Sequence, residues 1–283
     1  MEPSVVSVDR EYAFSERDFA VIRRLVAEHA GIALSEAKRD MVYSRLVRRI
    51  RELELGSFRE YCQLLQSGDE AEFASFINAI TTNLTAFFRE PHHFDFLAAT
   101  ALPALLRARQ TSRRLRLWSS GCSTGEEPYS MAMVLRESLP AAQHWDTKIL
   151  ATDLDSNVLA HAAAGIYTED RLGGVEAKRL QRWFKRGRGD NAGKVRVRQE
   201  LAELITFKQL NLMNTWPMHG PFDVIFCRNV IIYFDKSTQK TLFERYAQLL
   251  ADDGYLFIGH SETLYRVTDR FRPLGQTIYA KSG

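Results

Sequence analysis

The sequence predicts an α/β protein: a parallel sheet that carries a small antiparallel β insertion and is preceded by an all-helical N-terminal domain. Two patterns indicate this class. Up to about residue 80 the apolar residues recur with helical spacing, whereas from residue 114 short apolar strands alternate with helices. Such alternation is typical of a parallel sheet with crossover helices. We therefore expect a helical domain over residues 1–85 and a sheet domain over residues 86–283.

The chain has 283 residues, of which 45% are hydrophobic and 26% charged, as in an ordinary soluble protein. Its 38 basic and 35 acidic side chains give a net charge of +3, too small to indicate a nucleic-acid partner. No run reaches the roughly 18 apolar residues of a membrane span, and residues 1–4 lack the pattern of a signal peptide. Cys62, Cys122 and Cys227 are spaced too widely for a disulfide framework or a zinc site. We expect a reduced, cytoplasmic protein.

Helices are expected in the N-terminal domain at residues 18–29, 36–51, 58–66 and 70–80. The second of these has Ser35 as its expected N-cap and holds six basic residues between Lys38 and Arg51. Its apolar residues fall on one side and most of its basic residues on the other, with Arg39 near the apolar side. The basic side has two interpretations: a solvated surface, or a surface that docks an acidic partner.

In the sheet domain each expected strand is a short apolar run. These strands are expected at residues 115–119, 148–152, 204–208, 222–227 and 255–259. Helices are expected from Glu127, from Ser156 and over residues 237–250. An insertion, residues 167–203, has a turn-rich stretch followed by alternating apolar and basic residues. This pattern predicts a short antiparallel hairpin attached to the main sheet.

A glycine-rich loop is expected between the first strand and the helix that follows it. Gly121 and Gly125 let the backbone turn tightly and approach a ligand closely. Thr124 and Glu127 have the spacing of a capping box at the start of the helix. The same stretch also matches the G-x-S-x-G motif of serine hydrolases, in which Ser123 would be the nucleophile.

A serine hydrolase would also need an acid and a histidine, and Asp223 and His260 follow Ser123 in the right order. Three observations weigh against it. Glu126 and Glu127 would place negative charge where an oxyanion must be stabilised. No segment supplies a second oxyanion donor, and no expected strand precedes this one. The hydrolase is therefore the weaker alternative.

A nucleoside is the better candidate ligand for the glycine-rich loop. Asp153 ends the second strand, where an acid can accept hydrogen bonds from ribose hydroxyls, whereas Asp155 is placed to cap the next helix. Asn211 follows the third strand, and Arg228 and Asn229 follow the fourth, so these residues should converge at one sheet edge. Acidic side chains beside the loop disfavour a pyrophosphate and favour a ligand with cationic groups, such as S-adenosylmethionine.

The histidines do not indicate a metal site. His92 and His93 are adjacent, so we expect them to point to different sides of a helix and to form a poor pair of metal ligands. His260 follows the last expected strand, where a hydrogen-bonding role is favoured over that of a base. We therefore predict that no metal takes part.

Four segments of the chain together resemble a known family. They are residues 81–90, 123–130, 226–234 and 259–262. In this order and spacing they are similar to the bacterial chemotaxis receptor methyltransferases, the CheR family, and the similarity runs through nearly the whole chain. The resemblance implies a Rossmann-like class I methyltransferase sheet over residues 86–283. It also implies methyl transfer from S-adenosylmethionine to the γ-carboxylate of specific glutamates on a receptor's cytoplasmic helices, with S-adenosylhomocysteine as product.

The resemblance implies roles for individual residues as well. The implied cofactor contacts are Asn83, Thr85, Arg89, Glu127, Asp153, Asn211, Leu212, Asn229 and Val230. Arg89 and Tyr233 would lie nearest the reacting methyl group and are the candidate catalytic residues. A glutamate carboxylate has a pKa of about 4.3 and is ionised at neutral pH, so the reaction needs no general base. We therefore expect Arg89 to orient the cofactor or the substrate rather than to transfer a proton.

Two surfaces are candidates for receptor contact, since the methylated segments of receptors in this family are acidic helical bundles. The first is the basic side of the helix at residues 36–51, with Lys38, Arg45, Arg48 and Arg49. The second is the inserted hairpin, on which some family members bind a receptor's C-terminal peptide as an extra strand. Its expected contacts are Arg186, Gly187, Gly189, Arg196 and Arg198. We expect a monomer. A non-catalytic adaptor that binds S-adenosylmethionine and receptors without turnover is the remaining alternative.

Overall fold

The computed structural model describes residues 10–140 and 144–282. The chain divides into two compact units, one that ends at Thr82 and one that starts at Asn83. The first unit is helical, and the second carries the sheets. Within the described ranges, no helix has both the length and the apolar character needed to cross a membrane.

The described part of the first unit contains four α-helices packed around an apolar interior. They are α1 (Glu16–Ala30), α2 (Arg39–Glu52), α3 (Phe58–Gln66) and α4 (Glu70–Ile80). Ser15, Ser57 and Asp69 cap α1, α3 and α4, because each side chain accepts a hydrogen bond from a backbone N–H of the first turn. The interior includes the buried side chains of Phe19, Ile22, Val26, Leu46, Ile50, Phe58 and Phe76.

The basic helix begins later than the sequence predicts. Residues Glu36–Lys38 form a separate 3-10 turn (η1), and α2 starts only at Arg39. The prediction that Ser35 caps this helix is therefore wrong. Because the turn separates Ser35 from α2, its side chain makes no capping hydrogen bond.

The basic side chains of α2 have different surroundings. Arg45 donates hydrogen bonds to two carbonyl oxygens at the end of α4, at 2.6 and 2.8 Å. Arg49 forms an ion pair at 2.5 Å with Glu72, a buried residue of α4. Lys38 and Arg48, by contrast, are exposed. Two of the four residues predicted to bind a receptor thus hold neighbouring helices of their own unit together.

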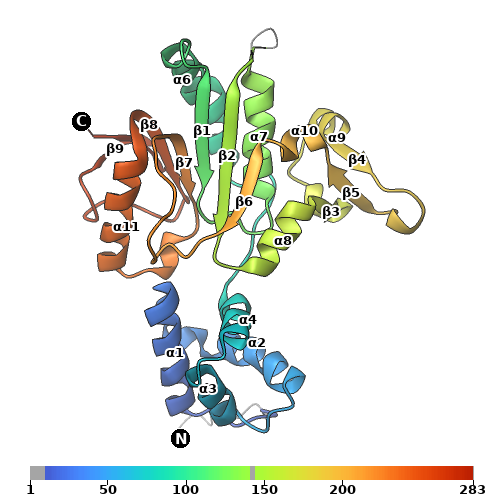
Figure 1. Cartoon of the computed structure of the whole chain (residues 1–283), viewed down its shortest axis with the longest axis vertical. Helices are drawn as coiled ribbons and strands as arrows, with labels where there is room; N and C mark the ends of the chain where they lie inside the picture. Colours follow the sequence, from blue (N-terminus) through green and yellow to red (C-terminus); the bar gives the residue numbers. More distant parts are fainter. Residues whose placement is uncertain (1–9, 141–143, 283) are drawn as a thin grey trace, which may run out of the picture. The chain divides into compact units, whose positions relative to one another are not determined.

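Seven described strands of the second unit form one sheet in the order β6-β2-β1-β7-β8-β10-β9 (Figure 1). They are β1 (Arg114–Ser119), β2 (Asp146–Asp153), β6 (Ile205–Gln209), β7 (Phe222–Cys227), β8 (Leu250–Ile258), β9 (Phe271–Gly275) and β10 (Ile278–Lys281). The strands from β6 to β8 are parallel, as predicted, but β10 and β9 add an antiparallel edge that was not predicted. Gln276 and Thr277 join these two strands with positive φ angles, and neither residue is the glycine that usually indicates such a turn.

The strand order reverses at β1. After β1 the chain adds β2 and β6 on one side, and it later adds β7 and β8 on the other. Figure 1 shows the arrows of β1, β2 and β7 pointing to the same edge of the sheet. In sheets of this kind ligands bind at the carboxyl ends of the strands where the order reverses. The loops that follow β1 and β7 therefore flank the expected binding position.

Helices cover both faces of the sheet. They include α5 (Pro91–Phe96), the π-helical segment η2 (Leu97–Ala101), α6 (Leu102–Ala108), α7 (Glu126–Ser138), α8 (Ser156–Ala164) and α11 (Lys236–Leu249). Alternate residues of each strand enter different cores. Leu117 and Val224 pack in the core that contains α7 side chains, whereas Trp118 and Ile225 pack in the core that contains α11 side chains.

The insertion forms a small antiparallel sheet of three described strands in the order β3-β5-β4, drawn in yellow to one side of the main sheet in Figure 1. Its strands are β3 (Ile166–Thr168), β4 (Phe184–Arg186) and β5 (Lys194–Val197), and its helical segments are η3 (Glu169–Leu172), α9 (Ala177–Trp183), η4 (Gly189–Asn191) and α10 (Gln199–Ala202). The predicted hairpin corresponds to β4 and β5. Gly187 allows its turn, because a Cβ atom there would lie 2.0 Å from the carbonyl oxygen of Asn191.

Candidate active site

The segment that starts at Asn83 lies against the glycine-rich loop. The side-chain amide of Asn83 donates to Asp155 at 2.8 Å. The backbone carbonyl oxygen of Asn83 accepts from the hydroxyl of Ser123 at 3.0 Å. The backbone N–H of Ser123 in turn donates to the carboxylate of Asp153 at 2.7 Å. Two predicted cofactor contacts that are far apart in the sequence, Asn83 and Asp153, are thus linked through Ser123.

The two aspartates at and just after the end of β2, Asp153 and Asp155, differ in their surroundings. Asp155 caps α8 by accepting from the backbone N–H groups of Asn157 and Val158 at 2.9 and 3.3 Å, which confirms the predicted cap. Asp153 is half-buried and accepts from the backbone N–H groups of Ser123 and Asp155. Burial raises the pKa of Asp153 to about 6, although these hydrogen bonds act in the opposite direction.

Both glycines of the loop are required by close contacts. A Cβ atom on Gly121 would lie 2.4 Å from a methyl carbon of Val230, in the loop that follows β7. Gly125 has φ of +97°, and a Cβ atom there would lie 2.8 Å from the hydroxyl oxygen of Tyr167. The loop between β1 and α7 therefore packs directly on the β7 loop and on the insertion.

The predicted capping box at the start of α7 does not form. Gly125 is the N-cap residue, and the hydroxyl of Thr124 donates to the carboxylate of Glu126 at 2.6 Å. The side chain of Glu127 contacts residues at the ends of two strands instead. Its carboxylate accepts from the hydroxyl of Ser119 at 2.7 Å and pairs with Arg228 at 3.0 Å. The prediction fails because a buried cation competes for the glutamate that the box would need.

Arg228 is the central cation of this sheet edge. It follows β7, its side chain is 2% exposed, and it pairs with Glu90 at 3.2 Å as well as with Glu127. Its guanidinium also donates to the carbonyl oxygen of Arg89. Burial alone would raise the pKa of Glu90, but Arg228 and a hydrogen bond with His260 hold it down to about 2. For Glu127, burial dominates and raises the pKa.

The insertion holds the other side of the glycine-rich loop. Glu126 is completely buried and pairs with Arg171 of η3 at 2.5 Å. The hydroxyl of Tyr167 in β3 donates to the carbonyl oxygen of Thr124 at 2.7 Å. Glu126 and Glu127 thus pair with arginines of this chain, which offset the negative charge that the sequence places beside the loop. Each oxygen of Glu127 can accept a second hydrogen bond, so its cofactor contact stays a prediction.

Glu262 joins the loops that follow β7 and β8. Its buried carboxylate accepts from the backbone N–H groups of Gly259, Asn229 and Ile232 at 2.5, 3.0 and 3.3 Å. Asn229 has φ of +57°, a conformation that few non-glycine residues adopt. Glu262 thus stabilises the backbone on both sides of Val230 at this sheet edge.

The remaining predicted residues have varied surroundings. Arg89 is half-buried and donates to the carbonyl oxygen of Leu84 at 2.7 Å. Leu212 packs in the core beside α11, whereas Asn211 accepts from a backbone N–H at 2.9 Å. Thr85 and Tyr233 are half-buried. The residues predicted to bind a peptide belong to the small sheet and to its adjoining turns, not to the loops at this edge: Arg186, Gly187, Gly189, Arg196 and Arg198.

Three residues hold the site together: Glu90, Arg228 and Glu262. The sequence placed Arg228 at this edge of the sheet but did not predict its ion pairs, and it assigned no role to Glu90 or Glu262. Each lies in one of the four segments that carry the family resemblance. The sequence did contain a signal for Arg228, because this residue directly follows the apolar end of a strand. A charged residue in that position is buried, and a buried charge needs a partner of opposite charge.

The hydrolase alternative is contradicted by the fold. Asp223 lies near the start of β7, where it accepts from the guanidinium of Arg109 at 3.0 Å and from the backbone N–H of Arg116 at 2.8 Å. Ser123 follows the carboxyl end of β1, so the two side chains lie at opposite edges of the sheet. A cavity of about 610 Å³ at the Asp223 edge is lined by Arg109, Asp253 and Lys281, among others, and by none of the predicted site residues.

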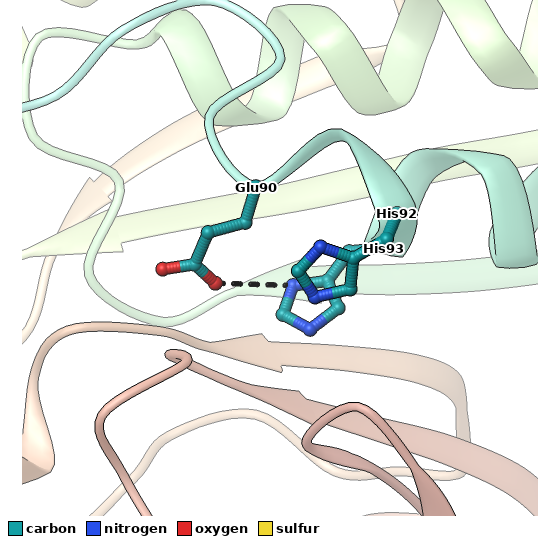
Figure 2. Close-up of side chains that lie close together, drawn as sticks. All are labelled: Glu90, His92 and His93. Atoms are coloured by element: carbon teal, nitrogen blue, oxygen red, sulfur yellow. Dashed lines mark ion pairs between the residues drawn. The ribbon is translucent and has the colours of Figure 1, made fainter.

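Glu90, His92 and His93 lie close together at the start of α5, and their potential ligand atoms are within 4.8 Å of one another (Figure 2). The expectation that the two histidines diverge is wrong, since their ring centroids are 4.2 Å apart. They meet because both rings lean toward Glu90, which precedes the helix.

The charges around these three residues oppose a metal ion. Arg228 already pairs with Glu90 at 3.2 Å, and its positive charge would repel a cation placed there. Burial and Arg228 lower the pKa of His93 to about 4, so its ring is neutral at pH 7 and does not itself repel a cation. The Nε2 atom of His93 lies 3.0 Å from the carbonyl oxygen of Gln276. His260 lies 2.9 Å from Glu90, in the hydrogen-bonding role that was expected. That no metal takes part stays a prediction.

Comparison with known proteins gives a consistent result along the chain. Residues 17–81 match the family model for the CheR methyltransferase all-alpha domain, and residues 83–280 match that for the CheR methyltransferase SAM-binding domain. The chain is 47% identical to a chemotaxis protein methyltransferase of Escherichia coli (strain K12), covering 98% of this chain and 95% of that protein. It is also 47% identical to chemotaxis protein methyltransferase 2 of Pseudomonas aeruginosa, covering 98% of each.

Among solved structures, the chain is similar to the DhpI–SAH complex, with a TM-score of 0.33 and 12% identity over 66% of this chain and 70% of that one. We draw nothing further from so distant a similarity.

We predict that Arg228→Met lowers the free energy of unfolding by about 3–5 kcal/mol, because it leaves Glu90 and Glu127 buried without a counter-charge. Urea denaturation at neutral pH measures the change. Arg186→Met is the control, because Arg186 is 80% exposed and should change stability by less than about 0.5 kcal/mol. An Arg228→Met protein as stable as the control would show that this cation does not hold the site together.

Proposed function

This chain belongs to the CheR family of methyltransferases, and we propose that it methylates the γ-carboxylates of specific glutamates on the cytoplasmic helices of chemoreceptors. The observation that carries the proposal is the match to chemotaxis protein methyltransferases over nearly the full length of both chains. Methyl esters of glutamate on the receptor and S-adenosylhomocysteine would be the products.

The residues at the sheet edge fit S-adenosylmethionine. The glycine-rich loop is held in place because Val230 and Tyr167 fill the space beside Gly121 and Gly125, and the half-buried carboxylate of Asp153 beside the loop is suited to accept from ribose hydroxyls. We propose that these residues hold the nucleoside together with the other predicted contacts, which are Asn83, Thr85, Arg89, Glu127, Asn211, Leu212, Asn229 and Val230. When bound, S-adenosylmethionine supplies an electrophilic methyl group.

The chain's own residues would align the reactants and exclude water. The target glutamate is ionised at neutral pH, so no side chain here has to remove a proton. Alignment of two reactants can lower a barrier by up to about 7–11 kcal/mol. We assign the alignment to Arg89 and Tyr233. The guanidinium of Arg89 is held by the carbonyl oxygen of Leu84 at 2.7 Å, and Tyr233 ends the turn η5 (Ile231–Tyr233) that Glu262 supports.

Calorimetry with S-adenosylhomocysteine, followed by transfer of labelled methyl groups to a receptor cytoplasmic fragment, tests this function. Arg89→Ala should lower kcat by about 100-fold or more, because an alignment error of about 1 Å can have this effect. Arg272→Ala, an exposed residue of β9, is the control and should match the wild type. Binding of S-adenosylhomocysteine without any methyl transfer by the wild type would favour the non-catalytic adaptor.

The raised pKa of Asp153 predicts how cofactor affinity depends on pH. The ionised carboxylate accepts from ribose hydroxyls, whereas the protonated form loses acceptor capacity. Because this pKa is about 6, the Kd for S-adenosylhomocysteine should stay constant near pH 7.5 and rise as the pH falls below about 6, by at most about tenfold per pH unit. Calorimetry across this range measures it. Asp153→Asn should bind weakly with a flat profile, and a wild-type Kd that is independent of pH would contradict this role.

We propose that the basic side of α2 docks the acidic receptor helices. Lys38 and Arg48 are the residues best placed for this, because both are exposed. Arg45 and Arg49 were predicted to act with them, and they stay part of the proposed surface. Both side chains bind residues of α4. Charge reversal at either position would therefore also disrupt the packing of α2 on α4, so these two residues are unsuitable for the test.

We therefore predict that Lys38→Glu combined with Arg48→Glu raises KM for the receptor fragment about tenfold at low salt. The difference from the wild type should shrink at about 0.5 M salt, because screening weakens contacts between exposed charges. Lys240→Glu with Arg272→Glu makes the same change of net charge on exposed residues elsewhere and serves as the control. Equal effects of the two double variants would contradict a specific docking surface.

We also propose that the small sheet binds a receptor's C-terminal peptide. Its strands β3 and β4 are the two outer strands of the order β3-β5-β4, and an outer strand can accept a further strand through its free backbone groups. Arg186 and Arg196 are exposed on β4 and β5, so a peptide with acidic residues is favoured. Gly187, Gly189 and Arg198 would shape the turn and the end of this site.

A further inference from the structure

Few large apolar side chains are exposed among the described residues. They are Leu84 (76% exposed), Tyr265 (72%), Ile232 (52%) and Leu274 (38%). A single exposed apolar residue is normal on a protein surface and needs no explanation. Three of these four, however, lie on segments that build the candidate active site: Leu84, Ile232 and Tyr265. Their shared location needs an explanation.

Leu84 and Ile232 are neighbours of the residues proposed to act on the reactants. Leu84 lies between the predicted cofactor contacts Asn83 and Thr85, and its carbonyl oxygen holds the guanidinium of Arg89 at 2.7 Å. Ile232 precedes Tyr233 in η5, and its backbone N–H donates to Glu262 at 3.3 Å. Both side chains are therefore exposed on segments that carry residues proposed to bind the cofactor or align the reactants.

Tyr265 follows Glu262 by three residues and is carried on the same loop after β8. This loop is tied to the segment of Leu84, because His260 lies 2.9 Å from Glu90. It is tied to the segment of Ile232 through Glu262. The three exposed side chains thus come from three segments that hydrogen bonds join around one sheet edge.

Two of the three apolar side chains have a cation nearby. Arg89 donates to the carbonyl oxygen of Leu84, and the guanidinium of Arg266 lies 5.2 Å from the ring centroid of Tyr265. Apolar residues interspersed with positive charge are complementary to an amphipathic surface that carries negative charge.

We propose that Leu84, Ile232 and Tyr265 form an apolar rim that binds the apolar side chains next to the target glutamate on an acidic, amphipathic receptor helix. The inference rests on the proposed function. Residues three and four positions from a glutamate lie on the same side of its helix, so they face the protein surface around the site when the glutamate approaches it. The rim then supplies the contact that selects a glutamate with apolar neighbours over other acidic residues of the same helix.

The test measures methyl transfer to a receptor cytoplasmic fragment by the full chain. Leu84→Ser, Ile232→Ser and Tyr265→Ser should each raise KM for the fragment about fivefold, and the triple variant by more than tenfold. The Kd for S-adenosylhomocysteine should stay within about twofold of the wild type in every variant. Leu274→Ser, on β9, is the matched control and should leave KM unchanged.

Conservative variants separate a lost contact from a damaged fold. Leu84→Met, Ile232→Val and Tyr265→Phe keep the apolar surface, and their KM should stay near that of the wild type. A triple serine variant with an unchanged KM would overturn the rim, and so would one that alters the oligomeric state instead, because the surface would then pair copies of this chain. If the wild type itself transfers no methyl group, the proposed function fails rather than the rim.

Discussion

The site depends on one buried positive charge, the guanidinium of Arg228. It follows the central strand β7 and pairs with Glu127 at the start of α7 and with Glu90 before α5. Because a buried charge is unfavourable without partners, these pairs fix three segments relative to one another. The same cation keeps Glu90 ionised and leaves His93 neutral. The backbone carbonyl of Arg89 is bound there too, so a candidate catalytic residue is held through its main chain.

Carboxylates that accept from backbone N–H groups hold the loops around this charge. Glu262 bridges the loops after β7 and β8, and Asp153 binds the loop after β1. These loops contain non-glycine residues with positive φ, among them Ser123 and Asn229, a conformation that surrounding contacts must stabilise. An edge that we propose binds a polar nucleoside needs polar groups that apolar packing does not supply, and hydrogen-bonded carboxylates hold its loops.

Several features that depend on local spacing could be predicted from the sequence, whereas features that depend on distant pairs could not. The parallel strands and the Asp155 cap were predicted because each rests on a few neighbouring residues. The capping box failed because Glu127 pairs with Arg228, about a hundred residues away. Arg45 and Arg49 were interpreted as a free basic surface because their partners on α4 are distant in the sequence as well. The role of Glu262 depends on a fold that no local pattern contains.

The contacts of Tyr167 and Arg171 bear on how such proteins can be re-engineered. Both residues precede the β4–β5 hairpin, yet they hydrogen-bond to the glycine-rich loop and neutralise the buried Glu126. The inserted segment therefore cannot be exchanged without changing contacts to the glycine-rich loop. A chimera that grafts the corresponding segment of another receptor system should keep this tyrosine and this arginine, with the graft junction placed after η3. A junction placed before β3 would exchange the proposed peptide-binding strands together with the contacts that hold the glycine-rich loop.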